Sequence, residues 1–150
     1  MPSWRDIASP QAEADLDGLV GVAIEFAQQQ LADHGEFFPF AAAVRTDGEI
    51  EMIAGRPDPA DEHPSSVDVI DTCIDALRSK RNNLRACAIV ADVTLTAPMR
   101  SDAIRVDLEH LDGHALAVAL PYAKKRRREI NYGPAQAHAG HHRIWEPPDR

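Results

Sequence analysis

Alternating hydrophobic and polar positions between residues 84 and 122 predict three β-strands in close succession. The first stretch, Leu84–Thr96, is apolar on both faces through its first half. The second, Ala103–Leu111, and the third, His114–Tyr122, alternate with a period of two, which is typical of strands. Asp112-Gly113 lies between them and suits a tight turn. One face of the second and third strands is expected to carry Ile104, Val106, Leu108, Leu116, Val118, Leu120 and Tyr122.

Two predicted helices and a predicted hairpin precede this meander. Ser9-Pro10 has the residue types of a helix start, and apolar residues recur every three or four positions until Gly35, which suits a helix end. Asp47-Gly48 joins two alternating stretches, 36–45 and 49–54, as a hairpin turn would. A second amphipathic helix starts at Ser65 or Ser66 and ends near Asn83.

These elements predict an α+β fold with the order α-β-β-α-β-β-β. We expect a mainly antiparallel five-stranded sheet with two helices packed on it, because the connections between paired strands are short. Residues 1–122 are expected to form one domain. Residues 123–150 are expected to form an irregular C-terminal extension, in which Glu129–Tyr132 has the pattern of one short strand.

The order of elements resembles the roadblock/dynein-light-chain type of profilin-like fold. The hairpin His34–Val44 with Asp47-Gly48 is also similar to small bacterial proteins without an assigned activity. The first resemblance implies a dimerising scaffold that binds other proteins, often small GTPases. It also implies the strand order 2-1-5-4-3, which would place Leu84–Thr96 at the edge of the sheet. An apolar edge strand invites pairing with another chain, so we expect a homodimer whose interface includes Cys87, Ile89 and Ala91.

Composition and charge narrow the classes of function. The chain has 150 residues and a net charge of −8, with nine basic against 21 acidic residues before residue 123. An acidic body disfavours nucleic-acid binding, which depends on neutralising phosphates. No apolar stretch reaches the roughly 20 residues of a membrane span, and the N-terminus lacks the pattern of a signal peptide. A cytoplasmic protein without membrane attachment is therefore expected.

The basic run is the strongest charge feature of the extension. It is expected to attract an anion or an acidic partner, or else to dock on the acidic body of the protein itself. The run consists of Lys124, Lys125, Arg126, Arg127 and Arg128.

Candidate chemistry is sparse. His34 and Glu36 follow the first helix and could form an acid–base pair in a pocket with Phe38 and Phe40, between the hairpin and the second helix. Asp92 is expected to lie where its strand emerges into solvent. Cys73 and Cys87 have no motif around them and are expected to be buried thiols. The tail histidines lack the ligand spacing of a zinc site, so we expect neither a metal nor a cofactor; they are His138, His141 and His142.

The sequence therefore favours a non-enzymatic module that regulates or neutralises another protein, acting as a homodimer. A small ligand-binding domain or enzyme with a pocket near residues 34–40 is the first alternative. Binding of an anion or a nucleic acid through residues 124–128 is the second.

Overall fold

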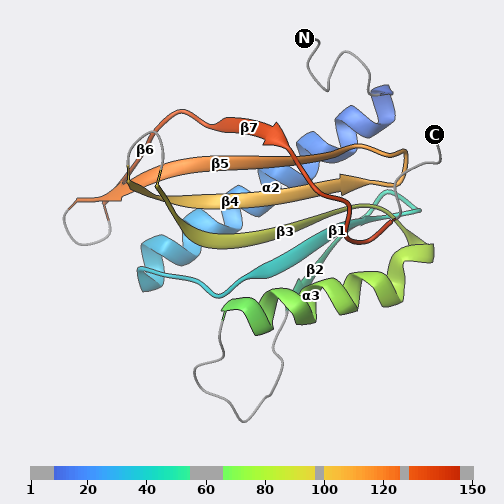
Figure 1. Cartoon of the computed structure of the whole chain (residues 1–150), viewed down its shortest axis with the longest axis horizontal. Coiled ribbons are helices and arrows are strands. Elements are labelled where there is room, and N and C mark those ends of the chain that lie inside the picture. The colour runs from blue at the N-terminus through green and yellow to red at the C-terminus, as the bar shows by residue number, and fades with distance from the viewer. Residues whose placement is uncertain (1–8, 55–65, 97–99, 126–128, 146–150) are drawn as a thin grey trace.

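The computed structural model describes residues 9–54, 66–96, 100–125 and 129–145. Two helices and a seven-stranded antiparallel sheet that curls into a half-barrel confirm the α+β class (Figure 1). The strands lie in the order β2-β1-β3-β4-β5-β6, and β7 also pairs with β5. In chain order the helices and strands are α2 (Pro10–His34), β1 (Phe40–Arg45), β2 (Ile50–Ala54), α3 (Ser66–Lys80), β3 (Leu84–Leu95), β4 (Ser101–His110), β5 (Ala115–Lys124), β6 (Ile130–Tyr132) and β7 (Gln136–Ala139).

The helix ends and turns that the sequence predicts are present in the structure. The Ser9 side chain accepts a hydrogen bond from the Ala12 N–H at 3.1 Å, and this bond caps α2. Gly35 ends α2 with a φ of 77°, a left-handed conformation that favours glycine. Gly48 and Gly113 have φ values of 92° and 107° in the turns of the two predicted hairpins.

The sheet has a hydrophobic core on each face. In Figure 1, α2 lies behind the sheet and α3 lies in front of it. The face toward α2 (the α2 face) carries the predicted apolar positions of β4 and β5 together with alternate residues of β1 and β3. The opposite face (the α3 face) packs Cys73 and Leu77 of α3 against β1, β2 and β3.

Leu84–Leu95 is a central strand, so its predicted position at the sheet edge is wrong. β3 pairs with β1 on one side and with β4 on the other. Cys87, Ile89 and Ala91 are buried inside the chain, with exposed fractions of 2%, 4% and 8%. The strand is apolar on both faces because each face is covered, which is the usual composition of an internal strand. The strand order implied by the profilin-like resemblance is not observed, and the homodimer stays a prediction without this support.

The C-terminal extension adds two strands to the sheet: β6 lies within the short strand considered at Glu129–Tyr132, whereas β7 falls in a segment predicted to be irregular. β6 pairs with the end of β5 at Tyr122–Lys124, and β7 pairs with its beginning at Leu116–Ala119. These strands have three and four residues, too few to give a periodic pattern. After β7 the chain crosses the α3 face of the sheet (Figure 1), and Ile144 is 2% exposed in the core there. The folding of residues 1–122 without the extension stays a prediction.

Candidate functional site

A hollow of about 430 Å³ lies between the C-terminal end of α2 and β3. The chain reverses direction at Gly35 after α2. Residues before and after Gly35 therefore line the same hollow. α2 contributes two residues four positions apart, the connection to β1 contributes three, and β3 contributes one. The lining consists of Gln30, His34, Glu36, Phe37, Phe38 and Asp92.

Asp92 is the acid of this hollow whose pKa is raised. The Tyr122 hydroxyl donates a hydrogen bond to an Asp92 carboxylate oxygen at 2.6 Å. Partial burial raises the pKa of Asp92; the Tyr122 hydrogen bond opposes this effect, and the nearby carboxylate of Asp102 adds to it. Lys124 lowers the Asp92 pKa and Glu36 raises it, each more weakly. The net rise means that the cost of partial burial exceeds the stabilisation that the Tyr122 hydrogen bond and Lys124 give to the Asp92 carboxylate.

Tyr122 acts as a donor here and not as a base. Burial, followed by the hydrogen bond to Asp92, raises the pKa of Tyr122 far above its usual value. The phenol therefore stays protonated at neutral pH and keeps the Asp92 side chain in place. Tyr132 lies beside it, with the two ring centroids 6.4 Å apart.

The predicted pocket is found in part. His34, Glu36 and Phe38 line the hollow as predicted, and Phe38 is 55% exposed. Phe40 is 7% exposed and packs in the α2-side core, with its ring 4.8 Å from that of Phe26. The second helix does not contribute to the lining, because α3 packs on the opposite face of the sheet.

Asp92 is the residue of the site whose hydrogen-bond partner sequence reasoning missed. It lies where the burial of β3 ends, as expected, and it is partly buried and hydrogen-bonded to Tyr122. The available signal was an acidic side chain in an otherwise apolar strand. Its partner Tyr122 is 30 positions away, and only the strand register reveals the pair.

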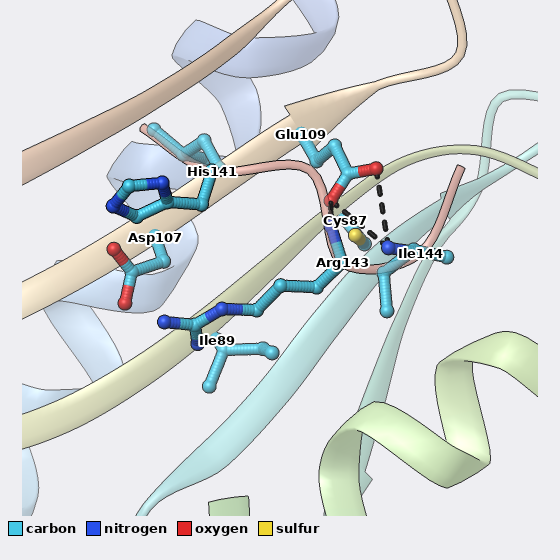
Figure 2. A pocket seen from close by; sticks show the side chains of 8 residues that line it. Cys87, Ile89, Asp107, Glu109, His141, Arg143 and Ile144 are labelled. Carbon is cyan, nitrogen blue, oxygen red and sulfur yellow. Dashed lines mark hydrogen bonds between the residues drawn. The ribbon is translucent and has the colours of Figure 1, made fainter. Parts of the chain in front are cut away.

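A second polar cluster holds the C-terminal segment to the sheet, and we call it the Glu109 clamp. Glu109 is 4% exposed on the α3 face of β4. Its carboxylate accepts hydrogen bonds from the backbone N–H groups of Arg143, Ile144 and Trp145, at 2.8, 3.1 and 2.7 Å. Figure 2 shows the carboxylate facing this segment. Arg78 of α3 holds the segment from the other side by donating a hydrogen bond to the Arg143 carbonyl at 2.6 Å.

The cavity beside the Glu109 clamp is too small for a ligand. Its volume is about 10 Å³, and its lining includes Cys87, Glu109 and Ile144 (Figure 2). A cavity needs at least about 10–15 Å³ to hold a single water molecule. The clamp is therefore a structural anchor.

A third polar cluster fastens α2 to the sheet. Asp15 accepts two hydrogen bonds from the Arg85 guanidinium, both at 2.9 Å, and lies 3.0 Å from His110 Nε2. The Asp112 N–H donates to His110 Nδ1, which leaves Nε2 to carry the proton shared with Asp15. Both Asp15 and His110 are buried and bonded, so this cluster is also structural.

The remaining candidates form no site in the part of the chain that the structure describes. Cys73 and Cys87 are buried free thiols; burial raises the pKa of Cys73 to about 11, and burial followed by the charge of Glu109 raises the pKa of Cys87 well above its usual value. In residues 9–54, 66–96, 100–125 and 129–145, no group of three or more histidine, cysteine or acidic side chains is placed to hold a metal ion. His138 lies exposed on β7, and His142 lies 3.8 Å from Glu109.

Lys124 and Lys125 are exposed at the end of β5, and Arg126, Arg127 and Arg128 lie outside the described residues. Neither of the two described helices is long and apolar enough to cross a bilayer.

No protein family, curated protein or solved structure matches this chain. The geometry and charge of its own residues therefore carry the functional argument.

Proposed function

We propose that the hollow beside the end of α2 binds a small organic cation, such as a protonated amine attached to an apolar body. The observation that carries this proposal is Asp92. Its raised pKa reports a carboxylate that lacks full compensation, in a cavity that has room for a partner. A cationic group within about 4–6 Å favours the charged form of a carboxylate. Binding would therefore be coupled to the ionisation of Asp92.

The size and the aromatic wall of the hollow support a small ligand. Its volume of about 430 Å³ falls within the roughly 300–1,000 Å³ of small-molecule sites. Phe37 and Phe38 supply apolar surface, and an aromatic face also attracts a cation. Glu36 adds a second carboxylate, while Gln30 and His34 supply polar groups that can orient the ligand.

Binding is favoured over catalysis. The described lining residues include no serine, cysteine, threonine or lysine that could act as a nucleophile. Tyr122 is committed to Asp92 and cannot easily give up its proton. The sequence-based prediction of a non-enzymatic module agrees with a binding role, while its protein partner stays a prediction.

The test compares matched ligands. Arylalkylamines and the neutral alcohols of the same shape are titrated into the protein, and binding is followed by calorimetry and by NMR shifts of residues 30–38. We expect the amine to bind at least about tenfold more tightly than its alcohol, a difference of about 1.4 kcal/mol. Asp92→Asn should abolish that preference, and Asp107→Asn on the opposite face should preserve it. Equal binding of amine and alcohol, or an unchanged preference in Asp92→Asn, would refute the proposal.

A further inference from the structure

β2 forms one edge of the sheet, and its outer side carries backbone N–H and C=O groups that do not pair with β1. Within the described residues, β2 pairs only with β1 and stands at the end of the strand order. The Arg45 N–H donates to the Glu49 carbonyl, which fixes the alternation along this hairpin. Backbone groups of antiparallel strands point to alternate sides. Those of Ile50 and Met52 therefore point away from β1.

The exposed side of this edge is apolar, which is unusual for a sheet edge. Ile50 and Met52 are 38% and 43% exposed. Edge strands of soluble proteins normally carry charges, prolines or bulges that prevent pairing with another chain. On this face of β2, the described positions carry none of these protections.

Helix α2 extends the apolar surface beside β2. A side chain placed at Gly18 would lie 3.9 Å from Ile50 Cδ1, so this turn of α2 adjoins the start of β2. Two turns later the Phe26 ring packs on Phe40, whose partner across the hairpin is Ala54 at the end of β2. The helix stripe from residue 18 to residue 26 therefore runs along the strand. The combined surface, which we call the β2 patch, consists of Val22, Phe26, Ile50 and Met52.

We propose that the β2 patch binds a second copy of this chain, with two β2 strands pairing antiparallel about a two-fold axis at Met52. In this register Met52 faces Met52 of the second copy, and the outward backbone groups of Ile50 meet those of Ala54. On the α3 face, Glu51 lies directly opposite the uncharged Ile53, and the two Glu51 side chains are diagonal neighbours about 7–8 Å apart. Glu51 is also held by Lys80 at 2.9 Å. The strand is therefore complementary to itself in backbone and in apolar contact.

Symmetry makes a second copy a better occupant than an unrelated strand. The two-fold axis is perpendicular to the sheet, so both α2 helices lie on the same face of the extended sheet. Val22 and Phe26 of each copy then flank the paired strands, and a single contact covers both β2 patches. Such an interface, which uses the same surface of both copies, is the commonest solution among soluble oligomers.

Cysteine cross-linking tests the register. In the proposed pairing the two Met52 Cα atoms lie about 5.5 Å apart, within the roughly 4.4–6.8 Å span of a disulfide. Met52→Cys should therefore form a covalent dimer under mild oxidation. Ile50→Cys is the matched control, because it has the same face and similar exposure but lies opposite residue 54. It should remain uncrosslinked. The native Cys73 and Cys87 are buried and should not contribute.

Sedimentation of the unmodified chain at micromolar concentration completes the test. We expect a dimer that Met52→Lys converts to a monomer while the far-UV spectrum and the thermal transition are retained. Leu111→Lys, at an exposed leucine in the β4–β5 turn, should leave the dimer intact. A monomeric wild type, a dimer that survives Met52→Lys, or equal cross-linking at positions 50 and 52 would overturn the proposal. Binding of an extended peptide by a monomeric chain would also overturn it.

Discussion

Substituting Glu109 by glutamine should loosen the C-terminal segment without changing the size of the side chain. The carboxylate accepts hydrogen bonds from three successive backbone N–H groups, at residues 143, 144 and 145. An amide has a single acceptor oxygen, and its NH₂ group would face an N–H donor. Hydrogen bonds to charged groups contribute about 1.5–3 kcal/mol each. Losing one of them gives an expected decrease of about 1.5–3 kcal/mol in the free energy of unfolding, and losing two gives about 3–6 kcal/mol.

A second estimate limits this value. A segment that is held poorly can detach, so the loss cannot exceed what its docking contributes. Docking buries Ile144 to 2% exposure, and burial of an isoleucine contributes about 1.5–3 kcal/mol. The bonds from Arg78 and Arg81 to the carbonyls of residues 143 and 144 add to this contribution. The two estimates agree in size, so detachment of the segment is the expected response.

Thiol labelling distinguishes detachment from global unfolding. Cys87 and Ile144 line the same small cavity, so release of residues 143–145 should expose the Cys87 thiol. In a Cys73→Ser background, we expect Glu109→Gln to label faster than the parent protein below the urea concentration at which either unfolds. Asp107→Asn, two residues earlier on the same face of β4, is the control. It breaks only the half-exposed ion pair with Arg105 and should cost less than about 1 kcal/mol.

One result for Glu109→Gln would contradict the proposed role of the Glu109 clamp. If Glu109→Gln unfolds at the same urea concentration as the parent and leaves Cys87 equally protected, the three backbone hydrogen bonds contribute nothing measurable. Early labelling of Cys87 in the Asp107→Asn control would show that charge on β4 matters, and not the hydrogen bonds to the segment.

Two further predictions follow from local geometry and from pKa. Gly140→Ala should lower the free energy of unfolding by about 1–3 kcal/mol, because its Cβ would meet the Leu116 backbone at 2.7 Å; Gly21→Ala, with nothing within 4 Å, should instead raise it by about 0.5–1 kcal/mol. Urea unfolding of both variants checks this contrast, and equal effects would contradict it. The raised pKa of Asp92 means that the folded state holds its proton more tightly than the unfolded state, so stability is lost as pH rises through the Asp92 pKa. Asp92→Asn should therefore gain stability relative to the parent as pH rises from about 4 to 7, and a constant difference across that range in pH-dependent melting would contradict the reasoning.

The local elements could be predicted from the sequence because their signals are local. Ser9 and Gly35 mark the ends of α2 by their own chemistry. Gly48 and Gly113 occupy turn positions that need positive φ. The alternation in β4 and β5 identified the residues that face α2, such as Val106 and Val118, which are paired across the two strands. Each of these inferences needs only a few neighbouring residues.

The strand order could not be predicted in the same way. A strand that is apolar on both faces can be a central strand covered on each face, or an edge strand that pairs with another chain. The pattern of Leu84–Leu95 fits both. The position of β3 in the sheet depends on which strands pair with its two sides. One of them is β1, which lies about 40 residues earlier in the sequence. Likewise β7 is held by backbone pairing along β5 and has little side-chain pattern. Pairing between strands that are far apart in the sequence gives no pattern within either strand alone.

The buried and half-buried carboxylates explain why the hollow, and not another polar cluster, is the functional candidate. Asp15 is matched by the Arg85 guanidinium and His110, and Glu109 by three backbone N–H groups. Each of these two acids joins a separate element to the sheet, and a fully satisfied set of hydrogen bonds is what structural burial requires. The Tyr122 hydroxyl and, more weakly, Lys124 favour the charged form of Asp92, while partial burial, Asp102 and Glu36 oppose it. Asp92 also opens into a hollow of about 430 Å³, which neither of the other two acids does, while its hydrogen bond with Tyr122 links β3 to β5. A carboxylate whose burial the fold does not fully offset, beside space for a cation, supports our proposal that a cationic ligand binds there from solution.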